Sequence, residues 1–283
     1  MLSSGFLRNT GHIPFKPPRV IVGHGDWFEG KIRAMAPDNK MPRIVGHRAN
    51  SLRTIREYLE TGVSGIEIDL ILNNGSGLVV EHVLEEDEFL DLLYRTEGVR
   101  LPSLKILGYR IQRLLGNKVV LRPTLDQLVS YINNIRPGIT LLLDLKTPGT
   151  GKALASFLDK NRSLDNSDVF VSSRYHIEFE ALKGHRVKKL ATLISRPLNV
   201  KDYLESMEAD GVSIEYPYVD RELVDELHDS GFLVAVWTVN DALVAKHLAK
   251  IGVDIIITDM PRRIIKALRD DNGGKRRRMR LRR

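Results

Sequence analysis

Residues 41–83 read MPRIVGHRANSLRTIREYLETGVSGIEIDLILNNGSGLVVEHV, and the rest of the chain repeats the pattern that they begin. An amphipathic stretch lies between two apolar runs, and a third apolar run follows a Gly-rich turn, which predicts a strand, a helix and two further strands. Side chains alternate between the faces of a strand, so Glu67 and Asp69 share one face and the apolar residues around them share the other. The first predicted strand ends on His47 and the third on His82.

Burying two carboxylates on one strand face costs free energy unless a cation or hydrogen-bond donors compensate for the lost hydration. A hard divalent ion such as Mg²⁺ or Ca²⁺ prefers oxygen ligands and would compensate for Glu67 and Asp69. The two histidines at the strand ends would then flank the ion as a general acid and a general base. The residues alone leave a second arrangement open, in which the carboxylates form buried salt bridges with Arg48 and Lys146.

The composition indicates a soluble intracellular protein. The chain of 283 residues is long enough for one α/β barrel or for two domains. It contains no cysteine, which excludes disulfides and thiolate zinc sites and favours a reducing cytoplasm. We expect no signal peptide and no transmembrane segment, because no apolar run has the length that either requires.

The positive charge gathers at the end of the chain. The net charge is +7, residues 275–283 carry seven of the positive charges, and residues 41–274 have a net charge of −3. This basic tail is expected to be disordered, with nucleic acid or an anionic membrane surface as its partner, or with no specific target. We therefore divide the chain into an N-terminal extension (1–40), which need not belong to the main domain, the main domain (41–270) and the tail (271–283).

From residue 43 onward, predicted strands and helices alternate, which favours a parallel sheet with crossover helices. Eight strands are predicted, at residues 43–47, 65–72, 139–146, 169–174, 189–194, 211–216, 233–239 and 255–260. The helices are predicted at 51–60, 124–134, 151–160, 176–184, 201–208, 220–230, 241–251 and 261–269. Eight such units predict a (β/α)8 TIM barrel. Residues 83–122 form a long insertion after the second barrel strand, and we expect it to act as a lid over the strands' C-terminal ends.

Active sites of such barrels lie at the C-terminal ends of the strands, where the polar residues of this chain gather. Asp144 and Lys146 repeat the i, i+2 pattern and add a third carboxylate and an ammonium group. Trp237 lies at the end of the seventh strand and by residue type fits the core, whereas Asp259, before Pro261, is placed to cap the last helix. Carboxylates, histidines and cations in one cluster suit a metal-bound phosphate ester.

These residues, in this order, resemble the motifs of the glycerophosphodiester phosphodiesterase family, a set of (β/α)8 barrels of the phospholipase C-like phosphodiesterase type. The resemblance covers about residues 44–261. It rests on His47-Arg48, Glu67-Ile68-Asp69, Val79-Val80-Glu81-His82, Asp144-Leu145-Lys146, Trp237 to Asn240, Gly252 to Asp254 and Thr258 to Pro261.

The resemblance implies a role for each matched residue. His47 and His82 would be the catalytic acid and base, Glu67, Asp69 and Asp144 would hold Mg²⁺ or Ca²⁺, and Arg48, Lys146, Trp237 and Asn50 would bind the substrate. The expected function is metal-dependent hydrolysis of small glycerophosphodiesters to an alcohol and glycerol phosphate, within lipid and glycerol metabolism.

Departures from the family pattern bear on the substrate. Ala49 and Val83 stand where the family usually has Gly and Asp, and Asp144 replaces a glutamate, so a metal must lie nearer this strand or bind it through water. One alternative is a phosphodiesterase of the sphingomyelinase or lysophospholipase D type. Another is a non-catalytic barrel that its basic tail recruits to nucleic acid or membrane.

Overall fold

The computed structural model describes residues 41–73, 77–81, 123–165 and 167–280. For residues 271–280 it describes the backbone alone. His82, the predicted insertion at 83–122 and the predicted extension at 1–40 lie outside the described residues. Predictions that concern them therefore stay predictions.

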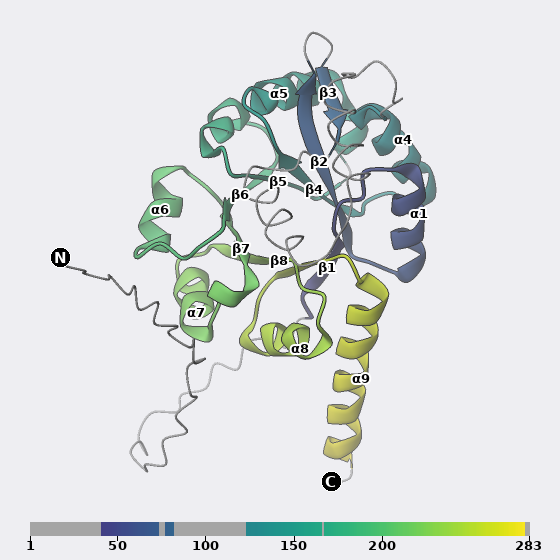
Figure 1. Ribbon diagram of the computed structural model, residues 1–283, viewed down its shortest axis with the longest axis vertical. Helices are drawn as coiled ribbons and strands as arrows, with labels where there is room; N and C mark the ends of the chain where they lie inside the picture. Colours follow the sequence, from purple (N-terminus) through teal and green to yellow (C-terminus); the bar gives the residue numbers. More distant parts are fainter. Residues whose placement is uncertain (1–40, 74–76, 82–122, 166, 281–283) are drawn as a thin grey trace, which may run out of the picture. The chain divides into compact units, whose positions relative to one another are not determined.

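The described residues form a closed barrel of eight parallel strands, as predicted from the alternation of elements (Figure 1). The strands are β1 (Arg43–Gly46), β2 (Gly65–Asn73), β4 (Thr140–Leu145), β5 (Val169–Ser173), β6 (Lys188–Leu193), β7 (Gly211–Glu215), β8 (Leu233–Trp237) and β9 (Ile255–Thr258). The ring closes because β1 pairs with β2 on one side and with β9 on the other. All eight C-terminal ends therefore meet at one mouth.

A ninth strand, β3 (Gly77–Val80), lies outside the closed ring. It pairs antiparallel with the last residues of β2, from Leu70 to Asn73. The earlier residues of β2, from Gly65 to Leu70, pair with β4 inside the ring. β2 thus extends beyond the ring at the mouth, and β3 runs back along it as far as Leu70.

Helices surround the strands in Figure 1. They are α1 (Leu52–Thr61), α4 (Leu125–Ile135), α5 (Thr150–Lys160), α6 (Val200–Ser206), α7 (Arg221–Asp229), α8 (Ala242–Ile251) and α9 (Pro261–Arg280), with 3-10 turns at Arg162–Leu164, His176–Leu182 and Tyr216–Tyr218. No helix in the described part of the chain is long and apolar enough to cross a bilayer.

The predicted helix starts are confirmed where a side chain caps the first turn. Thr124 accepts a hydrogen bond from the N–H of Gln127, and Asp220 and Asp241 cap α7 and α8 in the same way. The predicted helix at residues 176–184 is a 3-10 turn instead. Helix α9 continues to Arg280, past the predicted end at 269, although it contains Gly273 and Gly274, which disfavour helix.

Side chains inside the ring divide by height. Near the N-terminal ends of the strands they are apolar and form one buried cluster of Val45, Leu142, Phe170, Leu190, Ala235, Ile255 and Ile257. Nearer the mouth, the inward positions carry carboxylates, hydroxyls and cations. The apolar cluster is therefore the floor on which the polar site rests.

Glu178 is a buried carboxylate that ties the 3-10 turn at His176–Leu182 to the start of α5. Its two oxygens accept the backbone N–H groups of Gly149 at 2.8 Å and Gly151 at 2.7 Å. A Cβ on Gly151 would lie 2.3 Å from the carbonyl oxygen of Glu178, so only glycine permits this approach. A negative charge at a helix N-terminus is also favourable.

We expect Glu178→Ala to lower the free energy of unfolding by about 1 to 3 kcal/mol, because it leaves the buried N–H of Gly151 and the more exposed N–H of Gly149 without an acceptor. Urea denaturation followed by circular dichroism measures this. The control is Glu180→Ala, an exposed residue on the same turn, which should change stability by less than about 0.5 kcal/mol. Equal losses in both variants would contradict a special role for the buried carboxylate.

Candidate active site

A cavity of about 100 Å³ opens at the mouth of the barrel. It is lined by His47, Arg48, Glu67, Leu142, Asp144, Lys146, Ser172, Arg174, Thr192, Ser213, Trp237, Thr238 and Ile257. A larger hollow of about 310 Å³ lies at the other end of the strands, around Arg43 and Lys188. Both of these cations contact Asp168. The smaller cavity is distinguished by its place at the C-terminal ends of the strands and by the buried carboxylate of Glu67 in its lining.

Three carboxylates meet at one side of this cavity, as the strand pattern predicted. Glu67 and Asp69 come from β2, and Asp144 comes from the adjacent β4, where it is the direct register partner of Asp69. One oxygen from each lies within 4.8 Å of the others. Glu67 and Asp69 are almost wholly buried, with exposed fractions of 3% and 0%.

Lys146 lies against two of these carboxylates. Its Nζ is 2.5 Å from Asp144 Oδ2 and 3.2 Å from Asp69 Oδ1. Burial opposes its charge, but the surrounding carboxylates outweigh burial and hold the pKa of Lys146 well above its usual range. The salt bridge between Lys146 and Asp69 is one of those that the sequence left open. The other oxygen of Asp144 accepts a hydrogen bond from the hydroxyl of Ser172 at 2.9 Å.

Glu67 is the carboxylate with the weakest compensation. Its Oε2 accepts the backbone N–H of Arg48, which a left-handed backbone (φ of 53°) turns toward it. Its Oε1 is buried and has no hydrogen-bond donor among the described residues. Burial, followed by the charges of Asp69 and Asp144, raises the pKa of Glu67 well above its ordinary value.

The donor set fits a divalent ion. Three carboxylates converge, one buried oxygen has no donor in the described part of the chain, and oxygen ligands are what Mg²⁺ and Ca²⁺ prefer. Lys146 supplies only one positive charge to the three groups, so a bound cation would relieve the remaining repulsion.

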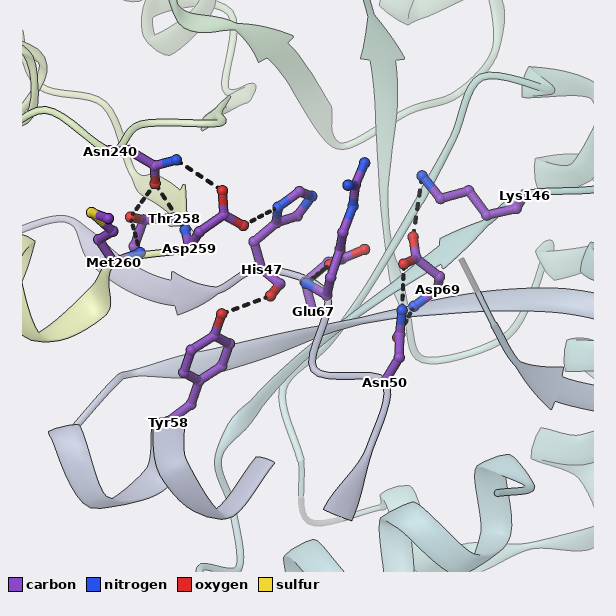
Figure 2. Close-up of polar contacts among 11 residues, drawn as sticks. His47, Asn50, Tyr58, Glu67, Asp69, Lys146, Asn240, Thr258, Asp259 and Met260 are labelled. Carbon is purple, nitrogen blue, oxygen red and sulfur yellow. Dashed lines mark hydrogen bonds and ion pairs between the residues drawn. The ribbon is translucent and has the colours of Figure 1, made fainter. Parts of the chain in front are cut away.

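His47 is held from behind by a carboxylate (Figure 2). Its Nδ1 lies 2.7 Å from Asp259 Oδ1, and Asn240 donates to the other oxygen of Asp259 at 2.8 Å. The hydrogen bond from His47 lowers the pKa of Asp259. An ionised Asp259 accepts the Nδ1–H, which leaves Nε2 as the ring nitrogen for proton transfer in the cavity that His47 lines.

Barrel closure explains how these two distant residues meet. Gly46 of β1 is the register partner of Thr258 of β9, so the residues that follow, His47 and Asp259, leave the sheet side by side. Helix α1 fixes the same corner, because the hydroxyl of Tyr58 donates to the carbonyl of His47 at 3.0 Å. Burial, with the nearby charges of Asp259 and Glu67, raises the pKa of Tyr58 to about 12, so this hydroxyl stays a donor.

Two residues have contacts that the sequence did not indicate. Asn50 is predicted to bind substrate; in the structure its amide N–H₂ donates to Asp69 Oδ2 at 2.6 Å and its amide oxygen accepts the N–H of Asp69 at 2.9 Å. It therefore orients a carboxylate (Figure 2) and is not among the described residues that line the cavity. Asp259 was placed as a helix cap, but its carboxylate contacts His47 and Asn240.

Three further residues that are predicted to bind substrate line the cavity. Arg48, Lys146 and Trp237 all line it. Arg174 was missed, although it follows β5 on the same face as Ser172 and the alternation of side chains could have found it. The place of His82 in the site stays a prediction, because this residue lies outside the described residues.

Comparisons with known proteins found a family model and relatives that match most of the chain. A sequence model of the glycerophosphoryl diester phosphodiesterase family matches residues 38–263. The chain is 25% identical over 256 residues to a glycerophosphodiester phosphodiesterase of Caldanaerobacter subterraneus subsp. tengcongensis, covering 80% of this chain and 97% of the relative. It is 26% identical over 254 residues to one from Bacillus altitudinis, covering 80% and 98%.

Solved structures share the fold. A phosphodiesterase of Oleispira antarctica, in complex with the product sn-glycerol-3-phosphate, superposes with a TM-score of 0.61 at 21% identity and covers 81% of this chain and 97% of its own. A putative glycerophosphodiester phosphodiesterase of Galdieria sulphuraria gives a TM-score of 0.62 at 24% identity, covering 81% and 98%.

Proposed function

The chain belongs to the glycerophosphoryl diester phosphodiesterase family, and from this premise we propose that it hydrolyses glycerophosphodiesters to an alcohol and glycerol phosphate. The observation that carries the proposal is the convergence of Glu67, Asp69 and Asp144 with the Asp259-supported His47 at one cavity. The Oleispira antarctica relative, which holds sn-glycerol-3-phosphate, supports the same product class.

We place Mg²⁺ or Ca²⁺ at the three carboxylates, with Asn50 orienting Asp69 and Ser172 orienting Asp144. Such an ion supplies positive charge that neutralises the phosphate oxygens and stabilises the charge that develops on them. Arg48 and Lys146, which line the same cavity, add positive charge toward the phosphate.

Protons move through the histidines in this proposal. One histidine takes a proton from the nucleophile, which is water or the neighbouring glycerol hydroxyl, and the other gives a proton to the leaving alkoxide. Asp259 keeps the proton of His47 on Nδ1, so that Nε2 performs the transfer. His82, the second residue after β3 in the sequence, is the proposed second histidine.

The proposed function is tested by assaying soluble glycerophosphodiesters with and without Mg²⁺ or Ca²⁺, alongside long-chain lysolipids and sphingomyelin. We expect metal-dependent release of glycerol phosphate from the soluble diesters. Turnover of the lysolipids or sphingomyelin alone would favour the lysophospholipase D or sphingomyelinase alternative. Turnover of none of them would favour the non-catalytic barrel.

Asp259→Asn is expected to lower kcat about 10- to 100-fold, a typical cost of removing a group that orients a functional histidine from behind. The neutral amide holds the Nδ1–H less strongly than a carboxylate and can instead turn its own N–H₂ toward the ring, so the imidazole loses its fixed tautomer and its charge support. The split between kcat and KM checks the cause, because Asp259 does not line the cavity that the described residues form, so KM should stay near the wild-type value.

The matched control for that variant is Asp254→Asn, since Asp254 also contacts a histidine, His228, at 2.9 Å but far from the cavity lining. We expect full activity there, with at most a loss of stability. An Asp259→Asn enzyme with unchanged kcat would remove Asp259 from the proposed mechanism.

Deleting residues 275–283 is expected to leave turnover of a small soluble diester unchanged, because the buried residues of α9, Ile264, Ile265 and Leu268, precede the deletion. If the tail binds nucleic acid or anionic vesicles, the shortened protein should lose that binding together with its steep salt dependence. The measurements are kcat and binding at two salt concentrations. A large loss of kcat would place the tail at the active site.

A further inference from the structure

The cavity has two halves with different chemistry. Strands β1, β2 and β4 supply the half that holds the carboxylates and His47. The other half is lined from β5 to β8 by Ser172, Arg174, Thr192, Ser213, Trp237 and Thr238. Among the described lining residues of this second half, Arg174 is the one that carries a charge.

The position of Arg174 follows from the strand pattern. Ser172 is the register partner of Asp144, and Arg174 lies two residues beyond Ser172, directly after the end of β5 at the mouth. Its guanidinium carbon lies 5.8 Å from the centre of the Trp237 ring, on β8. The side chain thus reaches across the mouth, past β6 and β7, and the indole face orients its planar fork.

We propose that Arg174 selects glycerophosphodiesters in which one of the two organic groups carries a second anionic group, a phosphate or a carboxylate. The inference rests on the proposed function and adds the substrate class. The scissile phosphate belongs to the half with the carboxylates and His47, so one organic group extends into the half with Arg174. There it meets hydroxyls, an indole face and a guanidinium.

Each of these features suits a small anionic polyol. The hydroxyls of Ser172, Thr192 and Ser213 can bond the hydroxyls of a polyol, and the Trp237 ring can pack against its carbon atoms. A guanidinium fork matches the oxygens of a phosphate or a carboxylate with two parallel hydrogen bonds. A quaternary ammonium head group such as choline would instead meet a like charge, which disfavours it.

The second anionic group has two possible positions, which the products distinguish. Hydrolysis adds the hydroxyl of water to phosphorus, and the leaving oxygen gains the proton. If the acidic group lies on the leaving alcohol, a diester of two glycerols with one terminal phosphate yields two molecules of glycerol phosphate. If it lies on the retained glycerol, the products are a glycerol bisphosphate and glycerol.

The test compares kcat/KM for three diesters: bis(glycerol) phosphate, the same diester with one terminal phosphate, and glycerophosphocholine. We expect the terminal phosphate to raise kcat/KM about tenfold to a hundredfold over the neutral diester, the usual contribution of a hydrogen bond between charged groups, with the choline ester slowest. Arg174→Gln should abolish this preference by lowering kcat/KM for the doubly anionic diester most, whereas Arg174→Lys should retain part of it.

Arg196→Gln is the matched control, because Arg196 lies on the next loop of the same rim, contacts Asp220 at 2.8 Å and is absent from the cavity lining that the structure describes. It should keep the wild-type preference. A uniform loss on all three diesters in Arg174→Gln would mean that Arg174 contacts the scissile phosphate, and would overturn the proposal. So would a wild-type enzyme without preference.

A binding titration separates this inference from the proposed function. The chain has two tryptophans, so Trp27→Phe leaves Trp237 as the single fluorophore, and His47→Gln prevents turnover of the ligand. We expect the doubly anionic diester to bind more tightly than the other two, and the difference to vanish with Arg174→Gln. If no diester is hydrolysed by the wild type, the proposed function fails, and equal affinities in this titration would overturn the role of Arg174 as well.

Discussion

Replacing His47 with Gln is expected to lower kcat on a soluble glycerophosphodiester about 10²- to 10⁴-fold, the usual contribution of a general acid or base. Glutamine keeps a polar side chain that can still contact Asp259 but cannot transfer a proton. Because His47 lies outside the three-carboxylate cluster, the lost activity should not return at high Mg²⁺ or Ca²⁺. The measurement is kcat across a metal titration, with the fold checked by circular dichroism.

The control for this variant is His185→Gln. His185 also contacts a carboxylate, Asp159, at 3.2 Å, but it does not line the cavity that the described residues form. We expect wild-type kcat from it. His82→Gln should resemble His47→Gln, since the proposal gives that residue the opposite proton transfer. Near wild-type kcat in both His47→Gln and His82→Gln would reject acid–base catalysis by histidine and favour the non-catalytic barrel.

The fold could be predicted because its determinants are local. The alternation of apolar and amphipathic stretches predicted the eight barrel strands. Thr124, Asp220 and Asp241 predicted the starts of three helices, which their side chains cap. Tertiary contacts decided the exceptions. The segment from His176 forms a 3-10 turn whose Glu178 is buried against the first turn of α5, a contact that local propensity does not contain.

The carboxylate cluster of the site could be predicted from the strands. Side chains alternate along β2, which puts Glu67 and Asp69 on one face, and the register of parallel strands brings Asp144 to them. The contact of His47 with Asp259 joins residues 212 positions apart and depends on how β1 and β9 close the ring. The reach of Arg174 to Trp237 depends on a side-chain direction across the mouth, which no strand pattern specifies.

Glu67→Gln is expected to have opposite effects on stability with and without metal. In EDTA the variant should be the more stable protein at neutral pH, because an amide removes one of three close negative charges from a buried position. The raised pKa of Glu67 gives the direction with pH. The unfolded chain loses this proton near its ordinary pKa of about 4.3, before the folded protein does, so wild-type stability falls as pH rises through the folded-state pKa.

With Mg²⁺ or Ca²⁺ the order should reverse. An ion that binds only the folded protein stabilises it by about 2.7 kcal/mol at a concentration of 100 times Kd, and loss of one carboxylate raises Kd. The gain from metal should therefore be large for wild type and small for Glu67→Gln, whose activity should recover in part at high metal concentration.

The measurement is urea denaturation from pH 4 to pH 8, in EDTA and in each metal. Glu57→Gln serves as the control, because Glu57 is an exposed residue that contacts Arg53 on the surface of α1, and its response to metal should equal that of wild type. A Glu67→Gln protein that metal stabilises as much as wild type would remove Glu67 from the metal site. One that is less stable than wild type in EDTA at every pH would show that the ionised carboxylate is compensated by the folded protein itself, through Lys146 and the N–H of Arg48.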